Sequence, residues 1–218
     1  MKPITALIFD MDGTLLDSEP LHLRATQAAL GERGASYTER DNRAFFGATD
    51  SEMFRVLRIL FDLSEATDEL VARKRARLIA MVRAEPRPLP GVPAVLRSLR
   101  EAGLRLALAS ASAPPVIRAV VEALGLGSVF EAIVSADEVG RGKPAPDVFV
   151  IAARRLGVEP ESCLVVEDSR NGVLAGRAAG MTVAAIPCSA TSHEDFSAAD
   201  FVLPSLEGLP KVLGHNGV

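Results

Sequence analysis

Apolar residues form short runs that recur along the chain with helical patterns between them. The run "ITALIF" (4–9) is apolar and β-branched, which predicts a buried strand. Four further strands are predicted at 104–109, 132–134, 163–166 and 182–186. Helices are predicted between them at 92–103, 114–125, 146–157 and 170–180. Alternation of this kind indicates parallel βαβ units, so we expect an α/β fold with a Rossmann-like, doubly wound parallel sheet.

Residues 19–83 do not follow that alternation and have only helical patterns. Helices are predicted at 21–34, 38–47, 49–61 and 64–83, with Thr38, Thr49 and Ser64 as N-caps. We therefore expect a small all-helical domain, residues 18–84, inserted after the first strand. Residues 1–17 and 85–218 then form the α/β core.

Composition narrows the class of protein. The 218 residues are 48% hydrophobic and 24% charged, with a net charge of −4, which is typical of a globular domain and provides no overall basic field for nucleic acid. The Arg-rich stretch 73–83 is interpreted as a solvated helix face. Cys163 and Cys188 have no metal-ligand spacing and are expected to be reduced thiols. No apolar stretch approaches the roughly 20 residues of a membrane span, so we expect a cytoplasmic protein that binds no membrane.

Polar side chains follow the predicted strands at the points where these strands end. They are Asp10 and Asp12 after the first strand, Ser110 after the second, Lys143 beyond the third, and Glu167 and Asp168 after the fourth. The carboxyl ends of parallel strands meet at one edge of a sheet, where ligands bind in open α/β folds. The topology therefore predicts that these side chains lie close together.

Carboxylates gathered in this way need a cationic partner, because several like charges cannot all stay ionised together. A hard divalent cation such as Mg²⁺ would provide the counter-charge, and Lys143 and Ser110 could hold phosphate oxygens. Each feature alone has a simpler interpretation. Paired aspartates and "EDS" (167–169) are common at turns and helix caps, and an isolated Ser or Lys is usually surface. Their convergence at one edge favours a functional site.

Four separated motifs resemble those of the haloacid dehalogenase superfamily. They are "DMDGT" (10–14), "ASAS" (109–112), "KPAPDVF" (143–149) and "VVEDSRNGVLAGRAAGM" (165–181), and they occur in the family's order. The helical insert and "LDSEPLH" (16–22) are similar to the β-phosphoglucomutase-like branch.

The resemblance implies a role for each motif residue. Asp10 is the nucleophile that forms an aspartyl-phosphate, and Asp12 is the general acid and base. Ser110 and Lys143 hold the transferring phosphoryl group. The implied Mg²⁺ site comprises Asp10, Asp12 through its main-chain carbonyl, Asp168, and Glu167 directly or through water.

The resemblance also implies that the helical insert, residues 18–84, is a mobile cap domain that excludes water and recognises the leaving group. The crossings near 13–18 and 84–91 are the expected hinges. The candidate substrate contacts are His22, Phe46, Gly47, Thr49, Asp50, Ala111 and Ser112.

Several activities are compatible with this resemblance. The name-giving dehalogenases lack the second aspartate that is present here as Asp12, which disfavours dehalogenation. A β-phosphoglucomutase needs cap cations for a second phosphate, whereas residues 45–52 contain no Lys or Arg and carry Asp50 and Glu52. We therefore predict a phosphatase for a small phosphorylated metabolite such as a sugar phosphate. A mutase, or a catalytically silent binding protein, is the alternative. We expect a monomer or weak homodimer.

Overall fold

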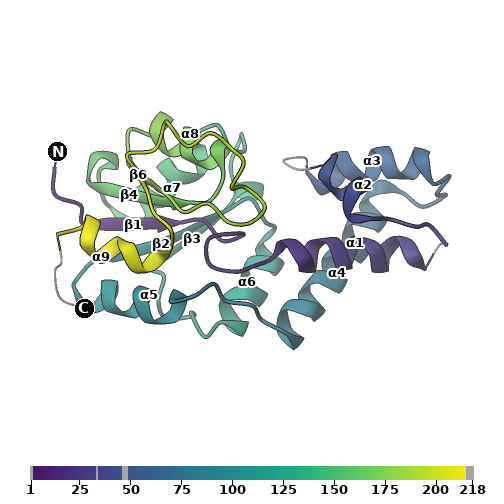
Figure 1. Cartoon of the computed structure of the whole chain (residues 1–218), viewed down its shortest axis with the longest axis horizontal. Coiled ribbons are helices and arrows are strands. Elements are labelled where there is room, and N and C mark those ends of the chain that lie inside the picture. The colour runs from purple at the N-terminus through teal and green to yellow at the C-terminus, as the bar shows by residue number, and fades with distance from the viewer. Residues whose placement is uncertain (1, 33, 46–48, 215–218) are drawn as a thin grey trace. The chain divides into compact units, whose positions relative to one another are not determined.

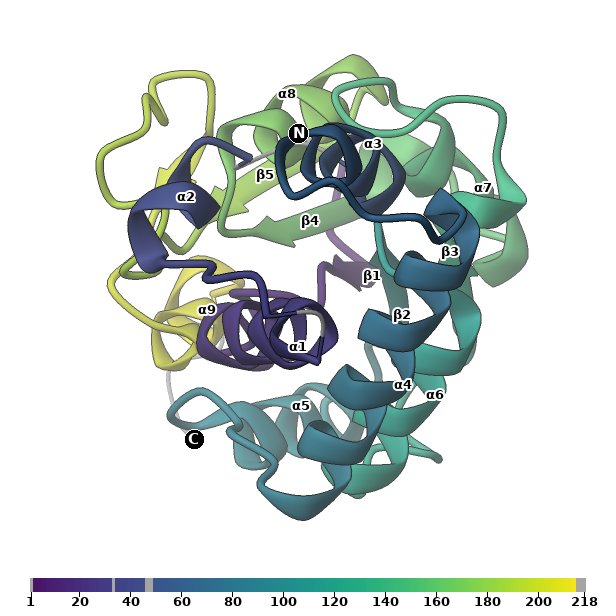
Figure 2. The ribbon, with the colours of Figure 1, turned by 90° about the vertical axis from the view of Figure 1, so that its right-hand side faces the viewer.

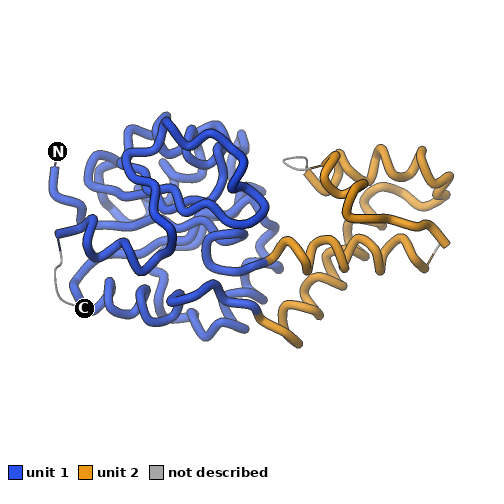
Figure 3. Tube along the Cα trace, in the orientation of Figure 1, with its two compact units in different colours: residues 1–17, 87–218 blue, residues 18–86 orange. Residues whose placement is uncertain are grey.

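The computed structural model describes residues 2–32, 34–45 and 49–214, and the chain divides into two compact units. One unit comprises residues 1–17 and 87–218, and the other comprises residues 18–86 (Figure 3). The boundary between them falls after Pro86, where the sequence suggested 84. No helix in the described ranges is long and apolar enough to cross a membrane.

The first unit is built on a six-stranded parallel sheet with the order β3-β2-β1-β4-β5-β6 (Figure 1). The strands are β1 (Ala6–Phe9), β2 (Arg105–Ser110), β3 (Ala132–Ser135), β4 (Cys163–Glu167), β5 (Thr182–Ala185) and β6 (Phe201–Val202). The predicted α/β class and its five strands are confirmed. The sixth strand was not predicted, because two residues do not make a recognisable apolar run.

Helices cover both faces of the sheet: α5 and α6 lie on one face, and α7 and α8 on the other (Figures 1 and 2). The helices of this unit are α5 (Val92–Glu101), α6 (Pro114–Ala123), α7 (Asp147–Leu156), α8 (Arg170–Ala178) and α9 (Leu209–Val212), with short 3₁₀ turns at Ala136–Glu138, Pro160–Ser162 and Leu206–Gly208. Ile8 and Val165 of the sheet pack with Phe149 and Val173 of these helices in one buried cluster. Burial on both faces explains why the strands are continuous apolar runs.

The strand order places the site. The chain forms β1, β2 and β3 outward in one direction, and then returns to place β4 on the other side of β1. Such a reversal is a topological switch point, and ligands bind outside the carboxyl ends of the strands there. The ends of β1 and β4 are therefore where chemistry is expected.

The second unit is helical, with α1 (Glu19–Gly31), α2 (Glu39–Arg43), α3 (Asp50–Leu60) and α4 (Thr67–Ala84). Helix α4 packs against α1 and α3 (Figure 2). Leu30, Phe54 and Leu70 meet in the hydrophobic core of this unit.

The helix starts of the second unit test the predicted N-caps. Thr38 and Thr49 cap α2 and α3 through capping boxes, as predicted. The predicted cap at Ser64 is wrong, because α4 begins at Thr67 with Ala66 as its N-cap and Glu69 reaching back to the Ala66 amide.

The Arg-rich stretch 73–83 is not solvated throughout. Lys74 is only 3% exposed, and its ammonium pairs with Asp50 of α3. A buried ammonium requires a partner, and Asp50 supplies it. Lys74 therefore belongs to the packing of this unit and not to a solvated face.

Candidate active site

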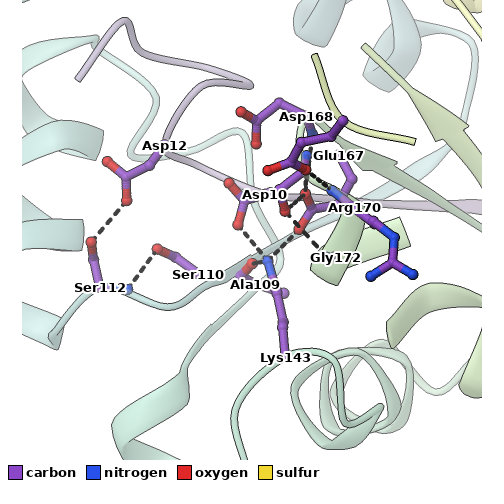
Figure 4. A network of polar contacts seen from close by, with 12 residues as sticks. Asp10, Asp12, Ala109, Ser110, Ser112, Lys143, Glu167, Asp168, Arg170 and Gly172 are labelled. Atoms are coloured by element: carbon purple, nitrogen blue, oxygen red, sulfur yellow. Dashed lines mark hydrogen bonds and ion pairs between the residues drawn. The ribbon is translucent and has the colours of Figure 1, made fainter. Parts of the chain in front are cut away.

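Three acidic side chains come from the adjacent ends of β1 and β4. The amide of Asp10 donates to the carbonyl of Val166 at 2.9 Å, which continues the pairing of β1 with β4 by one residue. Glu167 is the last residue of β4, and Asp168 follows it. The register of two parallel strands thus brings the three carboxylates to one point (Figure 4).

Lys143 lies between two of these carboxylates. Its Nζ donates to Asp10 Oδ1 at 2.5 Å and to Glu167 Oε1 at 2.6 Å, and also contacts the carbonyl of Ala109 at 3.2 Å. Burial by itself would lower the pKa of Lys143, but the two carboxylates outweigh burial and raise it. Lys143 is therefore a fixed positive charge in a site that is almost closed to water.

A divalent cation fits beside this lysine. Asp10, Glu167 and Asp168 each offer one oxygen, and these atoms all lie within 4.8 Å of one another. All three residues are buried, at 6%, 1% and 6% exposed. Burial raises the pKa of Asp10 well above its usual value although Lys143 opposes this, and burial together with Glu167 raises the pKa of Asp168 to about 7. A cluster of hard anionic oxygens with one lysine for three carboxylates suits Mg²⁺ or a similar cation.

The orientation of Glu167 is fixed by the start of α8. Its Oε2 accepts hydrogen bonds from the amides of Asp168 and Ser169, both at 3.0 Å, and from the Ser169 hydroxyl at 2.9 Å. A Cβ on Gly172 would lie 1.8 Å from the Glu167 carboxyl carbon, so only glycine allows this approach. Oε2 is thus held by the helix, while Oε1 contacts Lys143. Gly172 was not among the predicted site residues, although a glycine in the first turn of a predicted helix was an available signal.

Asp168 depends on a second glycine. Gly13 has a φ of +78°, and a Cβ there would lie 2.1 Å from Asp168 Oδ2. The turn after β1 therefore needs glycine both for its backbone and for the approach of this carboxylate.

Asp12 lies apart from the carboxylate cluster and is bound to the loop that follows β2. The Ser112 hydroxyl donates to Asp12 Oδ2 at 2.8 Å (Figure 4). The fully buried Ser110 at the end of β2 accepts a hydrogen bond from the Ser112 amide at 3.0 Å. Ala111 is exposed between the two serines. Three of the four predicted metal residues thus contribute side chains to the cluster. The fourth, Asp12, was predicted to bind the metal through its main-chain carbonyl and not through its side chain.

The predicted substrate residues of the second unit have local partners. Thr49 caps α3, Asp50 pairs with Lys74, and half-buried His22 lies in the first half of α1. Phe46 and Gly47 lie outside the described residues. Because Asp50 pairs with Lys74, its negative charge weighs less against a second phosphate than the sequence of residues 45–52 suggested.

The chain is similar to characterised hydrolases over most of its length. Residues 4–180 match the family model of haloacid dehalogenase-like hydrolases. The fructose-1-phosphate phosphatase YqaB of Escherichia coli (strain K12) is 38% identical, with 80% of this chain and 92% of that protein covered. Hexitol phosphatase B of the same organism is 35% identical, with 95% of each chain covered.

A solved structure supports the same relationship. A crystal structure of a CbbY variant from Rhodobacter sphaeroides in complex with xylulose-1,5-bisphosphate superposes with a TM-score of 0.84 at 30% identity, covering 93% of this chain and 95% of that one. The chain belongs to the haloacid dehalogenase-like hydrolase family.

Proposed function

We propose that this protein is a Mg²⁺-dependent phosphatase that hydrolyses a small sugar phosphate through a phosphorylated Asp10. The observation that carries the proposal is the position of Lys143 between Asp10 and Glu167, with Asp168 completing the cation cluster. Asp10 belongs to the proposed cation site and also pairs with Lys143. A carboxylate in this position is well placed to receive a phosphoryl group.

Asp10 attacks phosphorus in this scheme. A bond forms between an Asp10 oxygen and phosphorus while the bond from phosphorus to the leaving alcohol breaks. Lys143 and the Ser110 hydroxyl bind the phosphoryl oxygens. They thereby keep the leaving oxygen and phosphorus in line with the attacking oxygen of Asp10. When bound, Mg²⁺ supplies further positive charge to neutralise the phosphoryl oxygens.

Asp12 moves protons in both halves of the reaction. In protonated form it donates its proton to the leaving alcohol, and as a carboxylate it then removes a proton from the water that attacks the phosphorylated Asp10. That second step releases inorganic phosphate and restores the Asp10 carboxylate. The hydrogen bond from Ser112 gives Asp12 a defined position before substrate binds.

The names of the relatives suggest the class of substrate. Two of them are named for phosphorylated sugars or sugar alcohols, and the CbbY complex contains a sugar bisphosphate. We propose a sugar monophosphate as substrate and the helical unit, residues 18–86, as the cap that recognises its sugar part.

A mutase is the alternative within this family, and product analysis separates the two activities. The purified protein is incubated with Mg²⁺ and a panel of sugar monophosphates that includes fructose 1-phosphate and β-glucose 1-phosphate, and both free phosphate and isomerised sugar phosphate are measured. We expect free phosphate to accumulate catalytically and chelation of Mg²⁺ to abolish its release. Conversion of β-glucose 1-phosphate to glucose 6-phosphate without free phosphate would identify a mutase. Absence of turnover on the whole panel would contradict the proposed substrate class.

A further inference from the structure

The turn that follows β5 contacts one of the carboxylates of the cation cluster. The thiol of Cys188 donates to Asp168 Oδ2 at 3.2 Å, and the hydroxyl of Thr191 lies 3.4 Å from the same oxygen. Both residues lie outside the four sequence motifs, and no sequence signal connects them with Asp168.

The turn is internally bonded so that these two side chains stay together. The Cys188 amide donates to the Thr191 hydroxyl at 3.1 Å, and the amides of Thr191 and Ser192 donate to the Cys188 carbonyl at 3.2 and 2.9 Å. The Thr191 hydroxyl also lies 3.4 Å from the Cys188 sulfur. A turn closed in this way offers a thiol and a hydroxyl in a fixed arrangement.

The turn is also attached to the elements that carry the site. At its start, the Ile186 amide donates to the Glu167 carbonyl at 2.7 Å. Beyond its end, Glu194 accepts a hydrogen bond of 2.5 Å from the amide of Arg170, the first residue of α8. The turn is therefore hydrogen-bonded to the chain on both sides of Asp168, at Glu167 and at Arg170.

Gly13 also approaches Asp168 closely, since a Cβ there would lie 2.1 Å from Oδ2. Gly13, Cys188 and Thr191 therefore all lie against the same oxygen and leave this carboxylate little freedom. Groups that hold a metal-binding carboxylate in this manner set its orientation, and their loss commonly costs 10- to 100-fold in metal affinity.

We propose that Cys188 and Thr191 are positioning residues that hold Oδ2 of Asp168 and keep this carboxylate oriented toward the bound divalent cation. This role rests on the cation site of the proposed function. Neither residue touches the substrate in this account, and each acts only through Asp168.

The test compares variants that remove or keep the hydrogen-bond donor. Cys188→Ala removes the thiol, Cys188→Ser replaces it with another donor, and Thr191→Val removes the hydroxyl with little change of shape. Ser192→Ala is the matched control, because Ser192 is exposed in the same turn and its hydroxyl bonds to the carbonyl of Ser189. Mn²⁺ prefers oxygen ligands as Mg²⁺ does. Its binding is measured on the full chain by the loss of the free-ion electron paramagnetic resonance signal.

We expect Cys188→Ala to weaken Mn²⁺ binding by about tenfold, and Thr191→Val, which loses a longer hydrogen bond, by about threefold. Cys188→Ser and Ser192→Ala should stay within about twofold of the parent protein. The KM for substrate at saturating cation should not change, because the substrate is not contacted.

Each contrary outcome identifies what is wrong. Parent-like Mn²⁺ binding by a folded Cys188→Ala or Thr191→Val overturns the positioning role, and so does a Cys188→Ser variant as weak as Cys188→Ala. If Cys188→Ala does not fold, Thr191→Val alone decides. Failure of the parent protein to bind Mn²⁺ would instead overturn the cation site, and with it this part of the proposed function.

Discussion

The hydroxyl of Ser112 donates a hydrogen bond of 2.8 Å to Oδ2 of Asp12 and thereby joins the loops that follow β2 and β1. Ser112 is itself held on both sides, since its amide donates to Ser110 Oγ at 3.0 Å and its carbonyl accepts from the Ser135 hydroxyl at 2.8 Å. The proposed acid and base is thus positioned by a residue that is anchored to two neighbouring strands.

Removal of this hydroxyl should impair proton transfer more than substrate binding. We expect Ser112→Ala to lower kcat by about tenfold, which corresponds to about 1.4 kcal/mol, with KM within about twofold. Steady-state kinetics with Ser128→Ala as an exposed serine control checks this expectation. A raised KM with an unchanged kcat would instead support the sequence-based assignment of Ser112 as a substrate contact.

The position of the carboxylate cluster follows from strand ends, which is why it could be anticipated from sequence. Apolar runs revealed β1 and β4, and the parallel pairing of these strands brings Asp10 and Glu167 together. Lys143 was placed at the same edge by the same argument. The catalytic role of each residue stays a prediction.

Contacts that depend on distant turns or helices could not be anticipated in this way. Cys188 meets Asp168 across 20 positions, and Lys74 meets Asp50 across 24, with no periodic pattern to signal either pair. The strand β6 is too short to produce a pattern. At the start of α4, Ser64 was predicted as the N-cap because serine is a preferred residue there. The observed N-cap is Ala66, whose amide donates to the side chain of Glu69, three residues later.

The helical glycine beside Glu167 gives a second prediction. Gly172→Ala places a methyl group where the Glu167 carboxyl lies, so we expect a loss of about 1–3 kcal/mol in the free energy of unfolding and weaker Mg²⁺ binding. Urea unfolding and calorimetric Mg²⁺ titration measure the two effects. Gly31→Ala in α1 is the control, because a Cβ there meets nothing within 4 Å and alanine favours helix. Equal behaviour of the two variants would show that Gly172 is not needed for the carboxylate's position.

Cation binding should depend on pH near neutrality. In the cation-free protein the pKa of Asp168 is about 7, raised from 3.8 chiefly by burial, so the native state holds its proton more tightly than the unfolded state does. The contribution of Asp168 to the free energy of unfolding is therefore present at low pH and is lost as pH rises from about 4 to 7. A cation competes with that proton, so Mg²⁺ affinity should fall as pH falls below 7, by up to about tenfold per pH unit. Calorimetric titrations at several pH values test this, and a constant affinity between pH 5.5 and 8 would contradict it.

Lys143 should also contribute to stability, because its ammonium pairs with two buried carboxylates. Lys143→Met leaves Asp10 and Glu167 without this partner, so we expect a loss of about 3–5 kcal/mol in the free energy of unfolding, partly restored by Mg²⁺. Lys2→Met removes the exposed ion pair with Glu161 and should cost at most about 1 kcal/mol. Urea unfolding of both variants, with and without Mg²⁺, makes the comparison. If Lys143→Met loses no more unfolding free energy than Lys2→Met, the ion pairs of Lys143 with Asp10 and Glu167 have no structural role.

The central claim is that Asp10 carries the phosphoryl group, and trapping the phosphorylated protein tests it most directly. The full chain is mixed with ³²P-labelled acetyl phosphate and Mg²⁺, quenched in acid, and digested to locate the label. We expect a hydroxylamine-sensitive label on the peptide that contains Asp10, more of it in Asp12→Asn, and none in Asp10→Asn, whose turnover should fall by about 1000-fold, or about 4 kcal/mol. A label on another residue, or an Asp10→Asn variant that keeps more than about a tenth of the parent rate, would contradict the account.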